Sequence, residues 1–224
     1  MSRLSRFLLR LTEILTAELL LISGALFVSF LAFLIITKLV FLDGPEAFDT
    51  QVFAWFDALR ARYPGLTPWV LRLTFFGSAL WFIIAGLGLP GLLWWRKLRR
   101  EAVEVLATVI GASLLNQLLK MGFGRVRPLT ALLHQPGLSF PSGHAMIGLA
   151  LYGMLAWQLW RHGHHPVWAS LLLLWGLLVG LSRIYLHVHY PTDVLAGFAA
   201  GISWVVLVRL TVKYRLQQAR QNPE

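Results

Sequence analysis

Long apolar runs alternate with short polar segments along most of the chain. The runs occupy residues 19–42, 70–95, 102–121, 142–160, 167–181 and 191–210. A helix needs about 20 apolar residues to cross the hydrocarbon core of a bilayer, and most of these runs have roughly that length. The pattern therefore predicts an all-α integral membrane protein, built as a bundle of six transmembrane helices.

Small residues and one polar segment refine this picture. The glycines and the proline of residues 86–90 predict a looser or kinked helix near the end of the second run. Gly197 and Gly201 have the spacing that lets membrane helices approach closely. Residues 47–59 lie in the polar segment after the first run and predict a short surface helix.

Both ends of the chain are basic. Residues 1–18 carry three arginines among leucines, which predicts an amphipathic segment at the membrane surface. The run 19–42 is too long for the core of a signal peptide and lacks a small-residue cleavage site, so we expect a retained span. Residues 211–224 form a basic tail. No repeat or linker divides the part between, so 19–210 is predicted to be one six-helix domain.

Composition agrees with a membrane location and narrows the partners. The chain is 57% hydrophobic and only 13% charged, whereas soluble domains carry about 25% charged residues. The net charge of +10 sits in short clusters between apolar runs, so it fits anionic lipid head groups and not nucleic acid. The absence of cysteine excludes disulfides and thiolate chemistry.

Lysine and arginine concentrate at the chain ends and in alternate connections. The basic residues concerned are Arg3, Arg6, Arg10, Arg96, Lys97, Arg99, Arg100, Arg161, Lys213, Arg215 and Arg220. Six spans place all of them on one side, and such loops face the cytoplasm. Both termini are therefore predicted to be cytoplasmic in the plasma (inner) membrane. Segments 43–68, 122–140 and 182–190 would then face the periplasm or the exterior.

The outward-facing segment 182–193 carries ionisable residues between two apolar runs. Such groups are costly beside a membrane, so a functional site is the default interpretation. His189 and Asp193 are four residues apart, and Pro191 suits the first turn of a following helix. The carboxylate could fix the imidazole tautomer and leave the other ring nitrogen as nucleophile or base. Arg183 adds a forked donor suited to phosphate oxygens. The alternative is a membrane-edge loop with incidental polar residues.

Two further outward-facing segments point to an anion. Lys120, Arg125 and Arg127 would repel one another unless an anion lay between them, and a basic snorkelling edge fits poorly on this face. Ser142 is placed to cap the fourth span, where Gly143 allows close approach to free backbone N–H groups. His144 could offer a proton there, although ordinary capping beside a hydrated histidine explains this segment equally well when taken alone.

Together these segments predict a phosphate cradle with a nucleophile and a general acid. No carboxylate cluster accompanies them, so we expect no metal ion and no other cofactor. His162, His164 and His165 are predicted to form a solvated turn, because no carboxylate is expected nearby. The roles of Arg125 and His187 are left open.

Three patterns carry a family resemblance: Lys120-x6-Arg127-Pro128, Pro141-Ser142-Gly143-His144 and Ser182-Arg183-x5-His189-x3-Asp193. In residue, spacing and order they resemble the signature of the type 2 phosphatidic acid phosphatase (PAP2) superfamily, over residues 19–210 at most. The resemblance implies that His189 attacks phosphorus to form a phosphohistidine, that Asp193 orients it and that His144 protonates the leaving oxygen. It also implies a phosphoryl-binding set: Lys120, Arg127, Ser142, Gly143 and Arg183.

The resemblance, the lack of a carboxylate cluster and the distribution of basic residues together predict a metal-independent membrane lipid phosphatase acting at the outer leaflet. Undecaprenyl diphosphate, phosphatidylglycerol phosphate, phosphatidic acid and lipid A are all open as substrates, and the oligomeric state is open too. One alternative is a lipid phosphotransferase with the same intermediate. Another is a non-enzymatic lipid or ion transporter, which is disfavoured because its ionisable groups would lie near the bilayer midplane.

Overall fold

The computed structural model describes the backbone of residues 3–221 and the side chains of residues 20–215 and 218. The helices are α1 (Arg3–Lys38, extended by a π-helical turn Leu39–Asp43), α2 (Glu46–Arg62), α3 (Thr67–Phe75, after a 3₁₀ turn Pro64–Leu66), α4 (Ala79–Trp95), α5 (Arg99–Phe123), α6 (Gly143–Arg161), α7 (Pro166–Tyr185) and α8 (Pro191–Gln221). The described residues contain no strand, which confirms the all-α prediction.

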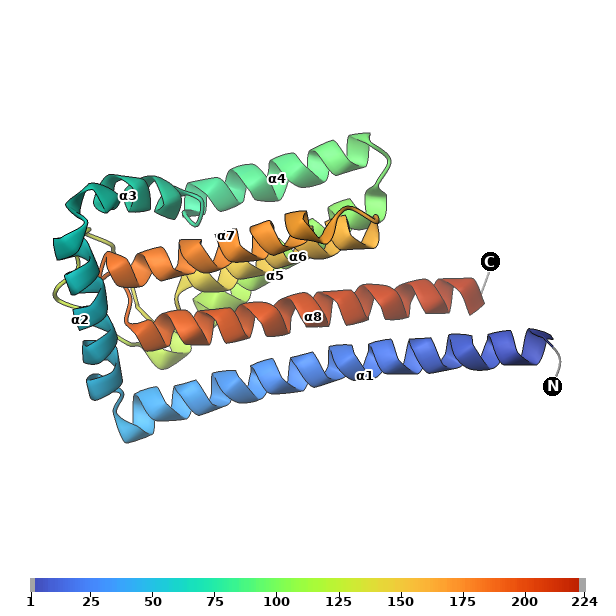
Figure 1. The fold of residues 1–224 in the computed structure, drawn as a ribbon, viewed down its shortest axis with the longest axis horizontal. Helices are drawn as coiled ribbons and strands as arrows, with labels where there is room; N and C mark the ends of the chain where they lie inside the picture. Colours follow the sequence, from blue (N-terminus) through green and yellow to red (C-terminus); the bar gives the residue numbers. More distant parts are fainter. Residues whose placement is uncertain (1–2, 222–224) are drawn as a thin grey trace.

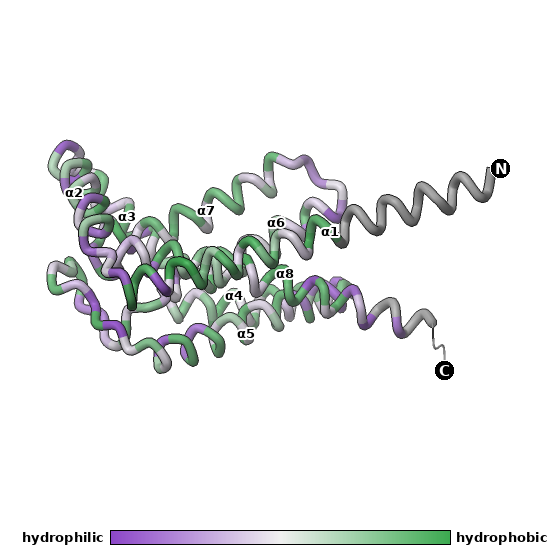
Figure 2. The backbone as a smooth tube through the Cα atoms, turned by 90° about the horizontal axis from the view of Figure 1, so that it is seen from below, coloured by the Kyte–Doolittle hydropathy of each residue, from purple (hydrophilic) through white to green (hydrophobic). Residues whose placement is uncertain are grey.

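The long helices run side by side along the molecule, and α2 lies across one end of the bundle (Figure 1). Hydrophilic residues gather at the two ends of the bundle, with apolar stretches between them (Figure 2). Helix α2 confirms the surface helix that the sequence predicted over 47–59. The start of α1 and the end of α8 both lie at the end opposite α2 (Figure 1).

Four helices are long and apolar enough to cross a membrane: Leu20–Asp43, Arg99–Phe123, Pro166–Tyr185 and Pro191–Arg215. The pair α3 and α4 makes a fifth if it is counted as one bent span. Helix α6 is not among these helices, yet it packs against α5, α7 and α8 and is buried over most of its length. A helix shielded by its neighbours needs fewer lipid-facing apolar residues.

The predicted second span, 70–95, is not one continuous helix. It breaks between α3 and α4 with a bend of 46°. The helix continues through Pro90, and the break that precedes α4 was not predicted from the sequence. The break falls at residues 76–78, where the hydroxyl of Ser78 accepts a hydrogen bond from Trp81 N (3.2 Å) and starts α4.

Close packing of α8 on α6 fixes the end of the bundle where the polar segments lie. A Cβ atom on Gly197 would lie 2.7 Å from the carbonyl oxygen of Ser142, and one on Gly201 would lie 2.5 Å from the carbonyl oxygen of Met146. The predicted close approach at these glycines is therefore confirmed. It brings the first turn of α8 beside the first turn of α6.

The predicted terminal segments can be followed only in part. The backbone of residues 3–18 is helical and continuous with the first span, but their side chains lie outside the described part of the structure. The amphipathic face predicted for 1–18 stays a prediction. Helix α8 continues to Gln221, so most of the predicted tail 211–224 extends the last helix.

Candidate active site

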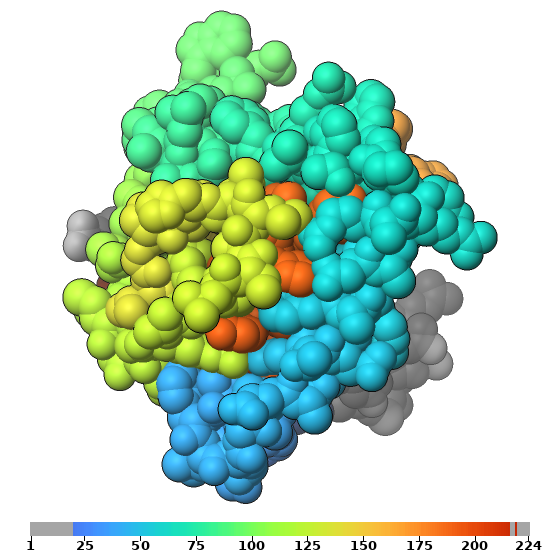
Figure 3. Space-filling view, turned by 90° about the vertical axis from the view of Figure 1, so that its left-hand side faces the viewer, coloured from blue at the N-terminus to red at the C-terminus, as the bar shows by residue number. Residues whose placement is uncertain are grey.

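The predicted site residues come together at the end of the bundle that α2 covers. They are contributed by the end of α5 (Lys120), the loop 124–142 (Arg127, Ser142), the start of α6 (Gly143, His144), the end of α7 (Arg183), the α7–α8 connection (His189) and the first turn of α8 (Asp193). Figure 3 looks onto this end, where the α7–α8 connection (orange) lies at the bottom of a seam between the loop (yellow-green) and α2 (cyan).

His189 is almost completely buried, with 2% of its surface exposed. Its Nε2 lies 3.1 Å from Nη1 of Arg127. A guanidinium can only donate, so Nε2 carries the lone pair and the ring proton lies on Nδ1. Nδ1 faces Ser139 Oγ at 3.3 Å and Asp193 Oδ2 at 3.5 Å. Burial lowers the pKa of His189 to about 3, assisted by the positive charges of Arg127 and Lys120 and opposed by Asp193.

Asp193 stands behind His189 and is fully buried. Its Oδ2 accepts hydrogen bonds from Tyr190 N (2.9 Å) and from the hydroxyl of Ser139. Ser139 can therefore accept from Nδ1–H of His189 while donating to the carboxylate. The sequence predicted the pairing of histidine and carboxylate but missed the serine that lies between them.

The cations are held by backbone carbonyls and by one hydroxyl. Lys120 donates to the carbonyl of Leu138, and Arg127 donates to those of Gly137 (3.0 Å) and Val188 (2.8 Å). Arg183 is 1% exposed, and its Nη1 donates to Thr74 Oγ1 at 2.7 Å. Its Nε and Nη2 are buried with no hydrogen-bond partner. Buried donors of this kind are costly unless a ligand satisfies them.

The start of α6 is organised differently from the prediction. Ser142 occupies the N-cap position, but its hydroxyl makes no capping bond and is buried without a partner. The prediction that its side chain caps α6 is therefore wrong. The Oγ adds another unsatisfied group beside the free N–H groups of the first helical turn. Asn116 holds this segment by donating to the carbonyl of Pro141 (3.2 Å).

His144 packs against the break between α3 and α4. A Cβ atom on Gly77 would lie 2.6 Å from Cδ2 of the His144 ring. Only a glycine leaves room for the imidazole at this point, which gives the break at residues 76–78 a role in the site. Arg183 is close enough to His144, Lys120 and Arg127 for its charge to act on all three.

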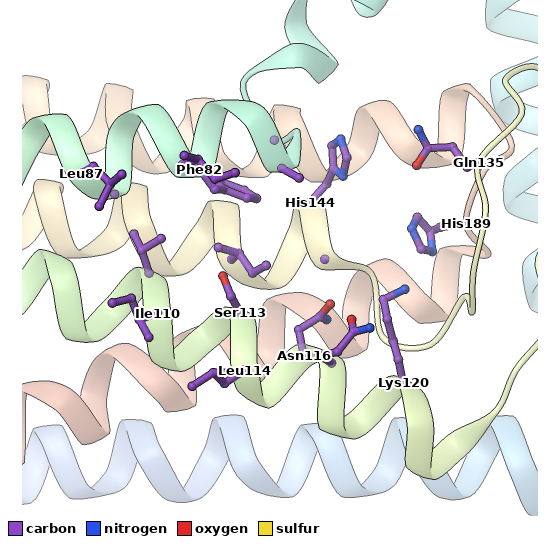
Figure 4. Close-up of a pocket in the computed structure, with 18 of the residues that line it drawn as sticks. Phe82, Leu87, Ile110, Ser113, Leu114, Asn116, Lys120, Gln135, His144 and His189 are labelled. Atoms are coloured by element: carbon purple, nitrogen blue, oxygen red, sulfur yellow. The ribbon is translucent and has the colours of Figure 1, made fainter.

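A cavity of about 580 Å³ has a polar end at several of these groups and extends between apolar side chains of the bundle. Its polar lining includes Lys120, Arg127, Gln135, His144 and His189. Its apolar lining includes Phe82, Ile83, Leu87, Ile110 and Leu114, on α4 and α5. Figure 4 shows the two histidines and Lys120 at one end and the apolar side chains leading away between the helices.

Two polar residues that the sequence left unassigned point away from the cavity. Arg125 lies between Asp193 and Asp49, the latter on α2. Its Nη1 is 2.6 Å from Asp193 Oδ1 and its Nη2 is 3.0 Å from Asp49 Oδ2. His187 lies in a turn, with a left-handed φ of 55°. Its ring stacks on Phe53 (4.2 Å between centroids) and its Nδ1 lies 3.1 Å from Thr130 Oγ1. His187 therefore joins the α7–α8 connection to α2 and to the loop.

The histidines at the opposite end of the bundle correct one expectation. His162 Nε2 lies 3.0 Å from Glu101 Oε1, so the prediction that no carboxylate lies near this cluster is wrong. Glu101 and the buried Glu104 also bind Arg161, which ties the start of α5 to the end of α6. Within the described residues, no group of three or more histidines and acids is arranged to hold a metal ion.

Comparison with known proteins gives consistent matches. The sequence model of the PAP2 superfamily matches residues 101–217. The chain is 32% identical over 189 residues to phosphatidylglycerophosphatase B of Bacillus subtilis (strain 168), covering 80% of this chain and 91% of that protein. It is 31% identical over 149 residues to a putative undecaprenyl-diphosphatase of Escherichia coli (strain K12), covering 62% and 72%.

A solved structure shares the fold. The crystal structure of a transmembrane PAP2-type phosphatidylglycerolphosphate phosphatase from Bacillus subtilis superimposes with a TM-score of 0.74 at 29% identity. The alignment covers 84% of this chain and 96% of that one.

Proposed function

Because the chain belongs to the PAP2 superfamily, we propose that it is an integral membrane phosphatase that hydrolyses the phosphate ester or diphosphate of a lipid. One observation carries this proposal. Arg183 and Ser142 have buried donors without hydrogen-bond partners. They lie beside Lys120, Gly143 and His144, which line the polar end of a cavity that becomes apolar away from that end. A phosphate attached to an acyl or prenyl chain matches both parts.

We propose His189 as the nucleophile, acting through Nε2. Its lone pair points to the side of Arg127, while Nδ1–H faces Ser139 and Asp193. Attack forms the Nε2–P bond and breaks the bond from phosphorus to the leaving oxygen, which belongs to the lipid alcohol of a monophosphate or to the lipid monophosphate released from a diphosphate. The carboxylate of Asp193 orients the ring and stabilises the positive charge that the ring acquires. Water then attacks phosphorus, releases inorganic phosphate and restores neutral His189.

The remaining residues would bind the phosphoryl group and supply protons. Lys120, Arg127 and Arg183 hold its oxygens, together with Ser142 Oγ and the backbone N–H of Gly143. His144 gives a proton to the leaving lipid oxygen and takes one back from the attacking water. Three fixed cations supply the charge stabilisation that many phosphoryl-transfer sites obtain from magnesium, which supports a metal-independent reaction.

The names of the relatives suggest the substrate class. One relative is a phosphatidylglycerophosphatase and another a putative undecaprenyl-diphosphatase. We propose a substrate from the same group: phosphatidylglycerol phosphate, undecaprenyl diphosphate or phosphatidic acid.

We propose that residues 19–210 form one catalytic domain of six spans, in which α6 is counted as a span in addition to the five described above. We also propose that the site faces the periplasm or the exterior. The distribution of basic residues supports this orientation. At the end of the bundle opposite α2, Arg96 and Lys97 lie in the α4–α5 connection, Arg99 and Arg100 start α5, and Arg161 ends α6. Such clusters favour the cytoplasmic face of the plasma (inner) membrane.

The test is a panel of lipid phosphates assayed with the purified protein in EDTA. The panel holds the three proposed lipids, lipid A and glycerol 3-phosphate as a soluble ester. We expect inorganic phosphate from at least one lipid, and much less from glycerol 3-phosphate, because the apolar lining contributes to binding. Release from none of the lipids, or only after magnesium is added, would overturn the proposal. Transfer of phosphate to an added lipid alcohol in place of water would make the protein a transferase.

A further inference from the structure

Asp193 is bound on the side away from His189 as well as on the side that faces it. Its Oδ1 accepts a hydrogen bond from Arg125 Nη1 at 2.6 Å. Its Oδ2 is the atom that faces Ser139 and His189. A carboxylate is rigid, so a group that fixes Oδ1 also fixes where Oδ2 points. The direction of the orienting acid therefore depends on Arg125.

Arg125 is held by partners from three segments. Its Nη2 lies 3.0 Å from Asp49 Oδ2 on α2, and its Nη1 also donates to Thr192 Oγ1 at 2.8 Å. The guanidinium lies over the ring of Tyr190, 4.0 Å from its centroid. A guanidinium that is hydrogen-bonded at both Nη atoms and packed against an aromatic ring on one face has little freedom to rotate.

Asp49 reaches the same helix turn directly. Its Oδ1 accepts from the backbone N of Thr192 and its Oδ2 from the Thr192 hydroxyl, both at 2.9 Å. Thr192 N is one of the N–H groups in the first turn of α8, which have no acceptor within the helix. A carboxylate there is also favoured by the helix dipole. Asp49 thus caps, from α2, the helix turn that carries Asp193.

The charge of Arg125 offsets part of the negative charge of two buried carboxylates. Asp49 and Asp193 are 3% and 0% exposed, and the charge of Arg125 lies between them. Burial raises the pKa of Asp49, and its bonds to Thr192 and Arg125 act in the opposite direction. The polar atoms of Asp49 and Arg125 bind each other, Thr192 and Asp193, so neither side chain is placed to hold a bound phosphate.

We propose that Asp49 and Arg125 are positioning residues for the reaction at His189, acting through the carboxylate of Asp193. The inference rests on the proposed function, because the positioned group is the proposed nucleophile. Loss of either residue should slow phosphorylation of His189 and leave binding of the phosphate group intact. Helix α2, which supplies no proposed catalytic residue, is then required for catalysis.

The experiment compares variants of the full-length protein on dioctanoyl phosphatidic acid. It measures KM, thermal unfolding and the rate of enzyme phosphorylation by rapid quench. Asp49→Asn keeps the size of the side chain, Arg125→Lys keeps the charge without the planar guanidinium, and Arg125→Ala removes both. Glu46→Gln is the matched control, because it neutralises an exposed carboxylate one turn earlier on α2.

Supporting residues of this kind change rates by roughly 10–100-fold. We expect a loss of about 10-fold in phosphorylation rate for Asp49→Asn and Arg125→Lys and of about 100-fold for Arg125→Ala, with KM within about 2-fold. Glu46→Gln should match the wild type. If Arg125→Ala does not fold, the two milder variants decide the question.

Two results would overturn the inference while the wild type remains active. The first is an unchanged phosphorylation rate in well-folded Asp49→Asn and Arg125→Lys. The second is a rise in KM at constant rate, which would make these residues part of substrate binding. Absence of activity in the wild type on every lipid phosphate is a different result, and it would remove the proposed function itself.

Discussion

The Nη1 atom of Arg127 lies 3.1 Å from Nε2 of His189 and 2.8 Å from the carbonyl oxygen of Val188, the residue before it. This arrangement fixes the position of Arg127, which is proposed to bind the phosphoryl group, relative to His189, the proposed nucleophile. Because the guanidinium only donates, it also selects the tautomer in which Nε2 is unprotonated. A phosphate oxygen bound by Arg127 would therefore bring phosphorus to the side of the ring that carries the lone pair.

His189 should remain neutral well below the pH at which a free histidine gains a proton. Burial lowers its pKa from 6.5 to about 3. Between these two pH values the unfolded chain binds a proton at His189 and the native state does not. The contribution of His189 to the free energy of unfolding is therefore complete above pH 6.5 and is lost as the pH falls toward 3. NMR titration of ¹⁵N-labelled imidazoles, assigned with His189→Gln, should show no protonation of this ring between about pH 7.5 and 5. A midpoint near 6.5 would contradict the burial argument.

Replacement of His144 should have an effect that depends on the leaving group. A general acid contributes about 10²–10⁴-fold, and most when the departing oxygen is strongly basic. His144→Ala should therefore lose far more kcat/KM on an alkyl monophosphate than on an aryl phosphate or a diphosphate. His189→Ala should lose activity on all of them. Equal losses in His144→Ala across leaving groups would mean that His144 binds phosphate and does not donate the proton.

A side chain at Gly77 should disturb the reaction through His144. An alanine Cβ there would lie 2.6 Å from the His144 ring and 2.5 Å from Val179 Cγ1, whereas a Cβ on Gly88 would meet nothing within 4 Å. A displacement of about 1 Å can cost up to about 100-fold in rate. Gly77→Ala should therefore reproduce the leaving-group dependence of His144→Ala, and Gly88→Ala should not. Steady-state kinetics on the same substrates tests this, and wild-type values for Gly77→Ala would show that His144 is not held by this contact.

The parts of the site that could be predicted from sequence are those set by local spacing. His189 and Asp193 lie one helical turn apart across the start of α8, and Ser142 to His144 open α6, so their neighbourhood follows from chain geometry. The apolar runs located the long helices because a bilayer demands them. What these patterns cannot give is the packing of one helix on another.

The residues that were missed all depend on that packing. Asp49 reaches Thr192 across 143 positions, and Ser139 reaches Asp193 across 54. The break at Gly77 leaves room for the imidazole of His144, and no local sequence pattern indicates that this contact exists. The pairing of His162 with Glu101 likewise joins the ends of two different helices. In each case the role of the residue depends on a partner that is distant in the sequence.

The orientation in the membrane can be read with single cysteines, because the chain has none of its own. Leu129→Cys lies fully exposed in the loop 124–142, and Arg96→Cys lies exposed between α4 and α5. In intact cells or spheroplasts an impermeant maleimide should label the first variant, and the second only after lysis. The opposite pattern would place the site on the cytoplasmic leaflet.

Phosphorylation of His189 at Nε2 is the central claim, and rapid chemical quench tests it most directly. Wild type and His189→Ala are mixed with ³²P-labelled phosphatidic acid or phosphatidylglycerol phosphate and quenched in base, and the labelled amino acid is identified after alkaline hydrolysis. The account predicts a base-stable, acid-labile label, carried as the Nε2 isomer of phosphohistidine and absent from His189→Ala. Label that persists in that variant, or that lies on Nδ1, would contradict it.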